Sequence, residues 1–314
     1  MPTDEVRGAK ERLVTVFEDA ADLVKKGEAA LAALDKGDGA RAWRLLSPKG
    51  THRGHGPAPK LCFVFPGQGS QYANMLAQLA RVEPVVAETF AEADEVMTPL
   101  LGRPLTSFLF VDAKDEAVLT RAEEELRDTT RTQPAVLTCD VALLRLLARH
   151  GIEPDLVMGH SLGEWAAVVA SGMLPFREAL VAVSARSRGM ASVSLGDPGK
   201  MASVLGPYEE IVRRLPEIPG YVVAANINAR NQTVIAGESD AVVRAVEYFG
   251  KEGMTAQLIN VSHAFHSRLV APAAEVRVEE GLEGFGGCDA VLLLAEAVAF
   301  VGEEQVLAVD AVRL

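Results

Sequence analysis

The stretch GHSLG at residues 159–163 constrains the fold of this chain more than any other feature. Three apolar residues, LVM, come directly before it, and a helical pattern, EWAAVVA, follows it. A serine between a strand and a helix sits on a turn too tight for bulky neighbours, so glycines stand two residues to either side. The turn also places Ser161 at a helix N-terminus, where free N–H groups and the helix dipole stabilise negative charge. The pattern predicts a nucleophilic serine; a purely structural turn is the alternative.

Strands and helices alternate around this turn, which predicts an α/β fold with a large, α/β-hydrolase-like subdomain on a parallel sheet. LCFVF at 61–65 is continuously apolar, as a buried strand would be, and runs into the loop PGQGSQ. Helical spacing of apolar residues follows at 78–98, 133–149 and 174–190.

From about residue 193 the pattern changes to short strands and helices in the order β-α-β-β-α-β. That order is typical of a ferredoxin-like unit, here inserted at 193–261. We therefore expect residues 56–192 to form the first part of the large subdomain and 262–314 to return to it. Residues 1–55 have helical spacing at 10–34 and then the Gly- and Pro-rich SPKGTHRGHGPAPK, which predicts a helical extension and a linker. A cleft between the two subdomains is the expected place for a site.

Composition excludes several classes of function. The formal net charge is −12 and the isoelectric point is near 5.1, which disfavours nucleic acid and anionic membranes as partners. The N-terminus lacks the apolar segment of a signal peptide, and the longest apolar run, AVLLLAEAVAFV, is too short to span a bilayer. The three cysteines lie far apart, outside any metal-binding pattern. We expect a cytoplasmic protein with reduced thiols.

A nucleophilic serine needs a base, and VSHAFHS at 261–267 contains both histidines downstream of Ser161. Spacing alone does not show whether His263 or His266 is that base. No aspartate between Ser161 and the pair stands out as a third catalytic member, which weighs against an ordinary esterase triad. Two histidines without a third ligand make a poor zinc site, so no metal is expected.

Acyl chemistry also needs donors for an oxyanion. The amide of Leu162 is one candidate, and the loop PGQGSQ is the expected source of another. That loop lacks the GxxxxGK[ST] spacing of a nucleotide site. Arg186 falls on the inward stripe of its helix, whereas Arg188 points away. A buried arginine needs an anionic partner, so Arg186 is either in a structural salt bridge or a clamp for a substrate carboxylate.

Six motifs in order over about residues 60–275 resemble the malonyl-CoA:acyl-carrier-protein transacylases. They are FVFPGQGSQ, TQPAVL, GHSLGEWAA, the Arg186 position, ANINARNQTVIAG and VSHAFHS. More narrowly, the chain is similar to the acyltransferase domains of type I iterative polyketide or polyunsaturated-fatty-acid synthases. The resemblance stops near residue 275, which predicts a divergent or truncated tail.

The resemblance implies a role for each candidate residue. Ser161 and His266 would form the catalytic dyad, and the amides of Gln68 and Leu162 would form the oxyanion hole. The residues implied for substrate binding are Arg186, Gln133, His263 and Phe265, of which Arg186 would bind the malonyl carboxylate. The HAFH sequence implies selection of malonyl over methylmalonyl units, because Phe265 could occupy the space of an α-methyl group.

The implied reaction moves a malonyl group from malonyl-CoA to the phosphopantetheine thiol of an acyl carrier protein, through an acyl-serine. No bound cofactor is implied: malonyl-CoA is the substrate, and the carrier protein supplies phosphopantetheine. The implied partners are that carrier protein and other synthase domains. Two alternatives remain, a serine carboxylesterase or thioesterase and a truncated, non-catalytic fragment of a synthase.

Overall fold

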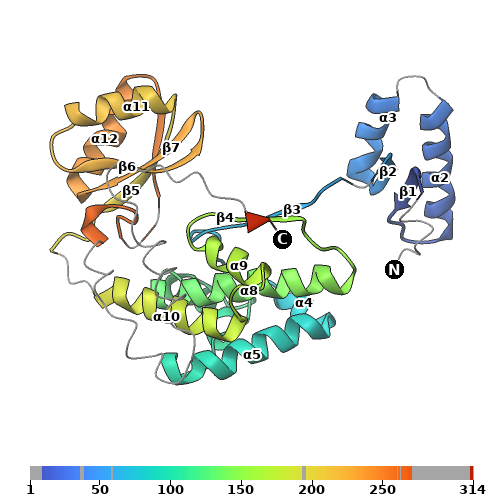
Figure 1. Ribbon diagram of the computed structural model, residues 1–314, viewed down its shortest axis with the longest axis horizontal. Helices are drawn as coiled ribbons and strands as arrows, with labels where there is room; N and C mark the ends of the chain where they lie inside the picture. The colour runs from blue at the N-terminus through green and yellow to red at the C-terminus, as the bar shows by residue number, and fades with distance from the viewer. Residues whose placement is uncertain are drawn as a thin grey trace. The chain divides into compact units, whose positions relative to one another are not determined.

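The computed structural model describes residues 9–35, 39–57, 59–192, 196–259, 261, 263–270 and 312–313. The chain divides into two compact units, Met1–Leu61 and Cys62–Leu314, which are labelled by element in Figure 1. The boundary lies a few residues after the predicted end of the N-terminal extension. The predicted divergent tail falls almost wholly outside the described residues.

The first unit is not wholly helical, which corrects the prediction for residues 1–55. Its elements are β1 (Glu11–Thr15), α2 (Ala20–Asp35), α3 (Gly39–Leu46), the 3-10 turn η1 (Ser47–Lys49) and β2 (Thr51–His55). β1 pairs antiparallel with β2, so the supposed linker contains a strand. The error arose because the pairing joins segments about forty residues apart, which local spacing cannot reveal. An ion pair between Arg53 and Glu11 links the two strands.

The large part of the second unit has an α/β fold. Its elements are β3 (Cys62–Phe65), α4 (Ala77–Val82), α5 (Pro84–Leu101), α6 (Thr106–Leu109), α7 (Glu116–Glu125), α8 (Thr129–Arg149), β4 (Leu156–Gly159), α9 (Gly163–Ala170) and α10 (Phe176–Ser192). β3 and β4 are parallel, with Phe65 opposite Gly159, and β9 (Val312–Arg313) pairs antiparallel with β4. The helix predicted at 78–98 is in fact two, because Pro84 lacks an N–H and begins α5.

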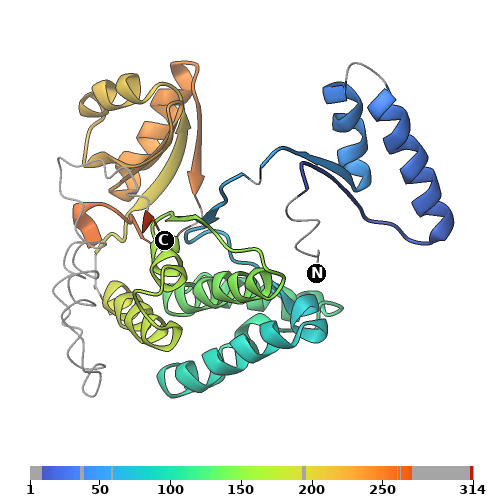
Figure 2. The same ribbon diagram turned by 45° about the vertical axis from the view of Figure 1, so that its right-hand side comes forward.

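The core of this part lies among α5, α8, α9 and α10. Figure 2 shows α5, α8 and α10, coloured cyan to yellow-green, side by side, and each pair of them is in contact. Phe90, Trp165 and Leu180 are among the largest fully buried side chains there. The helices that carry Gln133 and Arg186, α8 and α10, are therefore held in place by a close-packed interior.

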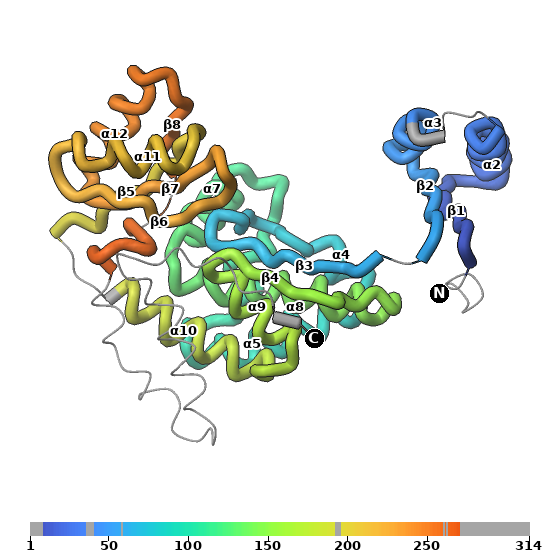
Figure 3. The backbone as a smooth tube through the Cα atoms, turned by 45° about the horizontal axis from the view of Figure 1, so that its top comes forward, coloured from blue at the N-terminus to red at the C-terminus, as the bar shows by residue number. Residues whose placement is uncertain are grey.

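The small part of the second unit follows in the predicted order of elements. These are β5 (Lys200–Leu205), α11 (Tyr208–Arg214), the 3-10 turn η2 (Leu215–Glu217), β6 (Val222–Ala229), β7 (Gln232–Gly237), α12 (Ser239–Lys251) and β8 (Thr255–Ile259). The strands form an antiparallel sheet in the order β6-β7-β5-β8. The helices α11 and α12 pack on this sheet (Figure 3) and bury Ile211 and Phe249 against Ile235. In the described part of the chain, no helix combines the length and apolar character needed to cross a membrane.

Candidate active site

The turn between β4 and α9 holds Ser161 in a left-handed backbone conformation, with φ of +53°. A Cβ atom on Gly159 would lie 2.1 Å from the Glu164 nitrogen, and one on Gly163 would lie 2.2 Å from the Phe65 carbonyl oxygen. Neither position can hold a side chain. The flanking glycines are required by close backbone approach, as the sequence pattern predicts.

Ser161 is hydrogen-bonded to His266, with 2.8 Å between Oγ and Nε2. The structure thus pairs the serine with His266 and not with His263, a choice that spacing alone left open. The two residues are 105 positions apart, so no local signal could have identified the pair. His266 also has a left-handed backbone, with φ of +57°.

The imidazole of His266 is poised to accept a proton. Burial is the main cause that lowers the pKa of His266 from 6.5 to about 4, and the electrostatic effects of Arg186 and His160 act in the same direction. The imidazole is therefore neutral at pH 7. With its proton on Nδ1, Nε2 accepts the hydrogen bond that the Ser161 hydroxyl donates, which is the arrangement a general base needs.

Arg186 on α10 is half-buried, whereas Arg188 is exposed, as the helical stripe predicts. The Nη1 group of Arg186 donates to Oε1 of Gln133 at 2.8 Å, and Gln133 is fully buried on α8. Burial lowers the pKa of Arg186 to about 10, while the negative charge of Glu164 raises it. The guanidinium therefore stays charged at pH 7.

The described residues offer Arg186 no salt-bridge partner within 4 Å, and its buried Nε has no hydrogen-bond acceptor among them. A half-buried guanidinium held by an uncharged amide has unused donors. Of the two alternatives for Arg186, this geometry favours a site for an external anion over a structural salt bridge.

The loop after β3 lies beside the serine turn. A Cβ atom on Gly67 would stand 2.7 Å from the His160 carbonyl oxygen, so the two backbones are in contact. The side chain of Gln68 exchanges hydrogen bonds with Thr129 Oγ1, at 2.9 and 3.1 Å, which fixes the loop to the start of α8. Within the described chain, the backbone N–H groups of Gln68 and Leu162 donate to no protein acceptor, so both are available to a ligand.

His263 and Phe265 lie together, with 5.9 Å between their ring centroids. Phe265 is buried in a small cluster with Met190 and Met201. Burial lowers the pKa of His263, and its buried Nδ1 has no partner among the described residues. In that same part of the chain no three His, Cys, Asp or Glu side chains group as a metal site.

Sequence reasoning missed one contact at the site. Nε2 of His160, within the serine turn, is 2.9 Å from Oδ1 of Asn228 on β6. This hydrogen bond joins the turn of the large part to the small sheet, close to the Ser161–His266 pair. Asn228 lies in the ANINARNQTVIAG motif, which was the available signal, but its partner is distant in sequence.

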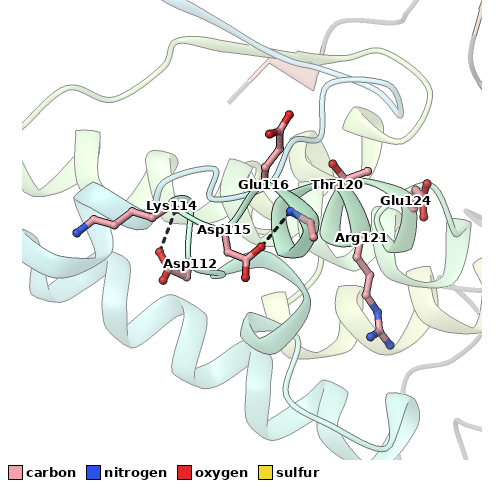
Figure 4. Close-up of a pocket in the computed structure, with 8 residues that line it drawn as sticks. Asp112, Lys114, Asp115, Glu116, Thr120, Arg121 and Glu124 are labelled. Atoms are coloured by element: carbon pink, nitrogen blue, oxygen red, sulfur yellow. Dashed lines mark hydrogen bonds between the residues drawn. The ribbon is translucent and has the colours of Figure 1, made fainter.

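An open surface hollow of about 860 Å³ lies elsewhere, around the loop before α7 (Figure 4). Two of its acidic residues take part in local structure: Asp115 accepts from the Ala117 nitrogen at 3.0 Å and Asp112 from the Lys114 nitrogen at 3.0 Å. These are a helix cap and a turn. None of the residues predicted for the site lines this hollow.

The α/β fold and the hydrogen-bonded Ser161–His266 pair are the features that an acyl-transfer enzyme with a serine nucleophile needs. Residues 62–283 match the family described as the acyl transferase domain, and the chain belongs to that family.

Known proteins with similar sequences and structures agree with this assignment. The chain is 35% identical over 235 residues to the malonyl CoA-acyl carrier protein transacylase of Bacillus subtilis, covering 73% of this chain and 69% of that protein. It is 36% identical over 264 residues to the polyketide synthase GfsA of Streptomyces halstedii, covering 83% of this chain but only 3% of that synthase. A solved malonyl-transacylase in complex with a type II polyketide synthase acyl-carrier protein has a TM-score of 0.65 and 33% identity, over 77% of this chain and 81% of that one.

Proposed function

We propose that this chain transfers a malonyl group from malonyl-CoA to the phosphopantetheine thiol of an acyl carrier protein, in polyketide or fatty acid biosynthesis. The name of the Bacillus subtilis relative contains malonyl CoA and acyl carrier protein, and the solved malonyl-transacylase is in complex with an acyl-carrier protein. The observation that carries the proposal is Arg186, a charged and half-buried guanidinium with unused donors near His266. A planar guanidinium binds a carboxylate through two parallel hydrogen bonds, and malonyl-CoA carries a free carboxylate beside its thioester.

The reaction proceeds in two half-reactions that use the same groups. Nε2 of His266 takes the proton of the Ser161 hydroxyl as Oγ attacks the thioester carbon. The amides of Gln68 and Leu162 stabilise the oxyanion, and the carbon–sulfur bond breaks as His266 returns the proton to the CoA sulfur. The thiol of the carrier protein then gives its proton to His266 and attacks the acyl-serine carbon. The bond from that carbon to Oγ breaks as His266 returns the proton to Oγ, which regenerates the Ser161 hydroxyl and neutral His266.

The arrangement of subdomains fits this chemistry. We propose an α/β-hydrolase-like large subdomain with a ferredoxin-like insert, in which Ser161 comes from the large part and His266 follows the insert. Gln133 would hold Arg186 through its amide, and His263 and Phe265 would line the wall that selects the acyl group. The protein itself would need no bound cofactor.

Intact-mass spectrometry of the protein after incubation with malonyl-CoA tests this function. We expect the mass of one malonyl group to be added and then lost when an acyl carrier protein carrying phosphopantetheine is supplied. A hydrolase would lose the label to water at the same rate without the carrier protein. A non-catalytic fragment would gain no mass, and either result would refute the proposal.

Acylation should stay fast well into mildly acidic solution. Only neutral His266 can accept the serine proton, and its lowered pKa of about 4 means that protonation begins only as the pH falls towards that value. We expect kcat/KM for malonyl-CoA, which reports free-enzyme pKa values, to be level from pH 8 to about pH 5 and to fall below it. Rapid pH-jump acylation measures this, with a return jump to neutral pH to check folding. A midpoint near the ordinary histidine value of 6.5 would contradict the described environment.

The double substitution His263→Tyr and Phe265→Ser, which converts HAFH to YASH, should raise methylmalonyl loading relative to malonyl loading. Phe265 belongs to the same buried cluster as Met190. The Met190 sulfur accepts a hydrogen bond from Gln133, the residue that holds Arg186. A smaller residue there opens space for an α-methyl group. Burial of one methyl is worth about 0.8 kcal/mol, so we expect the ratio to rise at least about fourfold in a competition assay. An unchanged ratio would exclude this wall as the selectivity element.

A further inference from the structure

Tyr221, the residue before β6, joins the small sheet to the segment that carries His266. The backbone nitrogen of Arg268 donates to the Tyr221 hydroxyl at 3.0 Å. The Arg268 guanidinium carbon also stands 3.9 Å from the centre of the Tyr221 ring, within the range of a cation–π contact. Arg268 lies two residues after His266. The geometry points to Tyr221 as a positioning residue that holds His266 against Ser161, an inference that rests on the proposed function.

The backbone of Tyr221 is held in place by hydrogen bonds to Glu238. Its backbone nitrogen donates to Oε2 of Glu238 at 3.1 Å, and its carbonyl oxygen accepts from the Glu238 nitrogen at 2.9 Å. A Cβ atom on Gly237 would lie 2.0 Å from the Tyr221 carbonyl oxygen, so the backbones of the two strand ends are in direct contact. The phenol therefore extends from a rigid end of the sheet, as a positioning group should.

The backbone at His266 needs such support. A left-handed φ of +57° on a residue other than glycine persists only when the surroundings hold it. Before His266, the Ala264 nitrogen donates to the Pro198 carbonyl oxygen at 2.9 Å. After it, the hydrogen bond from Arg268 to Tyr221 is the one that residues 267–270 make to another element within the described chain. Tyr221 thus secures one side of the catalytic turn.

Two substitutions at Tyr221 separate its contributions. Tyr221→Phe removes the acceptor but keeps the ring beneath Arg268, whereas Tyr221→Ala removes both. Because a displacement of about 1 Å can cost about 10²-fold in rate, we expect single-turnover acylation to slow about threefold for Phe and about 30-fold for Ala. The half-saturating concentration of malonyl-CoA should not change, because Arg186 and Gln133 are untouched.

The matched control is Tyr248→Phe. Tyr248 lies on α12, outside the catalytic turn, and its phenol donates to Oε2 of Glu217 at 2.5 Å. We expect wild-type acylation from this variant. Hydrogen exchange supplies a readout independent of activity: amides in 263–270 should exchange faster in Tyr221→Ala and at the wild-type rate in Tyr248→Phe.

Wild-type acylation and exchange in both Tyr221 variants would overturn the inference, and so would a loss that appears only in the half-saturating concentration. If the wild-type protein itself gains no malonyl group, the proposed function fails. The exchange experiment still decides the role of Tyr221 in that case, because unchanged protection of 263–270 would show that Tyr221 does not hold the turn.

Discussion

Replacement of Ser161 by alanine is expected to abolish covalent loading from malonyl-CoA. The Ser161 hydroxyl supplies the oxygen that forms the bond to the acyl group, and it is the hydroxyl hydrogen-bonded to Nε2 of His266. Loss of a nucleophilic serine lowers turnover by about 10⁶-fold in a well-studied protease, so we expect loading below detection, at least about 10³-fold down. Intact-mass spectrometry over a time course measures it.

The fold should tolerate this change. Ser161 is half-buried, and alanine differs from serine by one oxygen atom, so the glycine-enclosed turn keeps its shape. Ser171→Ala is the matched control, because the Ser171 hydroxyl donates to the Val168 carbonyl oxygen at 2.8 Å at the far end of the same helix. The control should load normally. Persistent loading of Ser161→Ala would show that another residue carries the acyl group.

Replacement of Arg186 by alanine should remove malonyl loading selectively. A hydrogen bond to a charged group is worth about 1.5–3 kcal/mol, and a bidentate pair uses two. We therefore expect malonyl loading to fall by at least about 10²-fold, which corresponds to about 2.7 kcal/mol or more. Acetyl-CoA has no free carboxylate, so its loading should change little. The ratio of the two loading rates, measured by mass spectrometry with each donor, is the quantity to compare.

Arg188→Ala provides the control for this prediction, since Arg188 lies on the same helix but is exposed. Arg186→Lys should fall between alanine and wild type, because lysine keeps the charge and loses the planar fork. The alanine variant also leaves Oε1 of Gln133 without its donor, so its melting temperature should be measured. An equal loss with malonyl-CoA and acetyl-CoA would mean that Arg186 supports the fold and not the carboxylate.

Local patterns predicted those features that local physics determines. The need for glycine at 159 follows from contacts within the turn itself, although Gly163 also faces Phe65 of β3, and the inward position of Arg186 follows from the helical repeat. The order of elements from 200 to 259 was likewise predicted, because each strand and helix carries its own apolar period.

Long-range contacts could not be predicted in this way. The pairing of β1 with β2, the choice of His266 over His263 and the hydrogen bond from His160 to Asn228 each join segments distant in sequence. The family resemblance implied His266, but no spacing rule did. The hydrogen bond from Arg268 to Tyr221 also joins segments 47 positions apart, so local spacing could not predict the support that Tyr221 gives to the His266 turn.

The small sheet lies, in chain order, between the two reacting groups. Ser161 precedes β5 and His266 follows β8, so the 2.8 Å contact between them closes a loop that contains the whole sheet. The folded sheet therefore contributes to the distance between Ser161 Oγ and His266 Nε2, across which the proton moves. Mutations that loosen the packing of the buried Phe249 or Ile235 would change that distance and slow acylation, although neither residue touches the substrate.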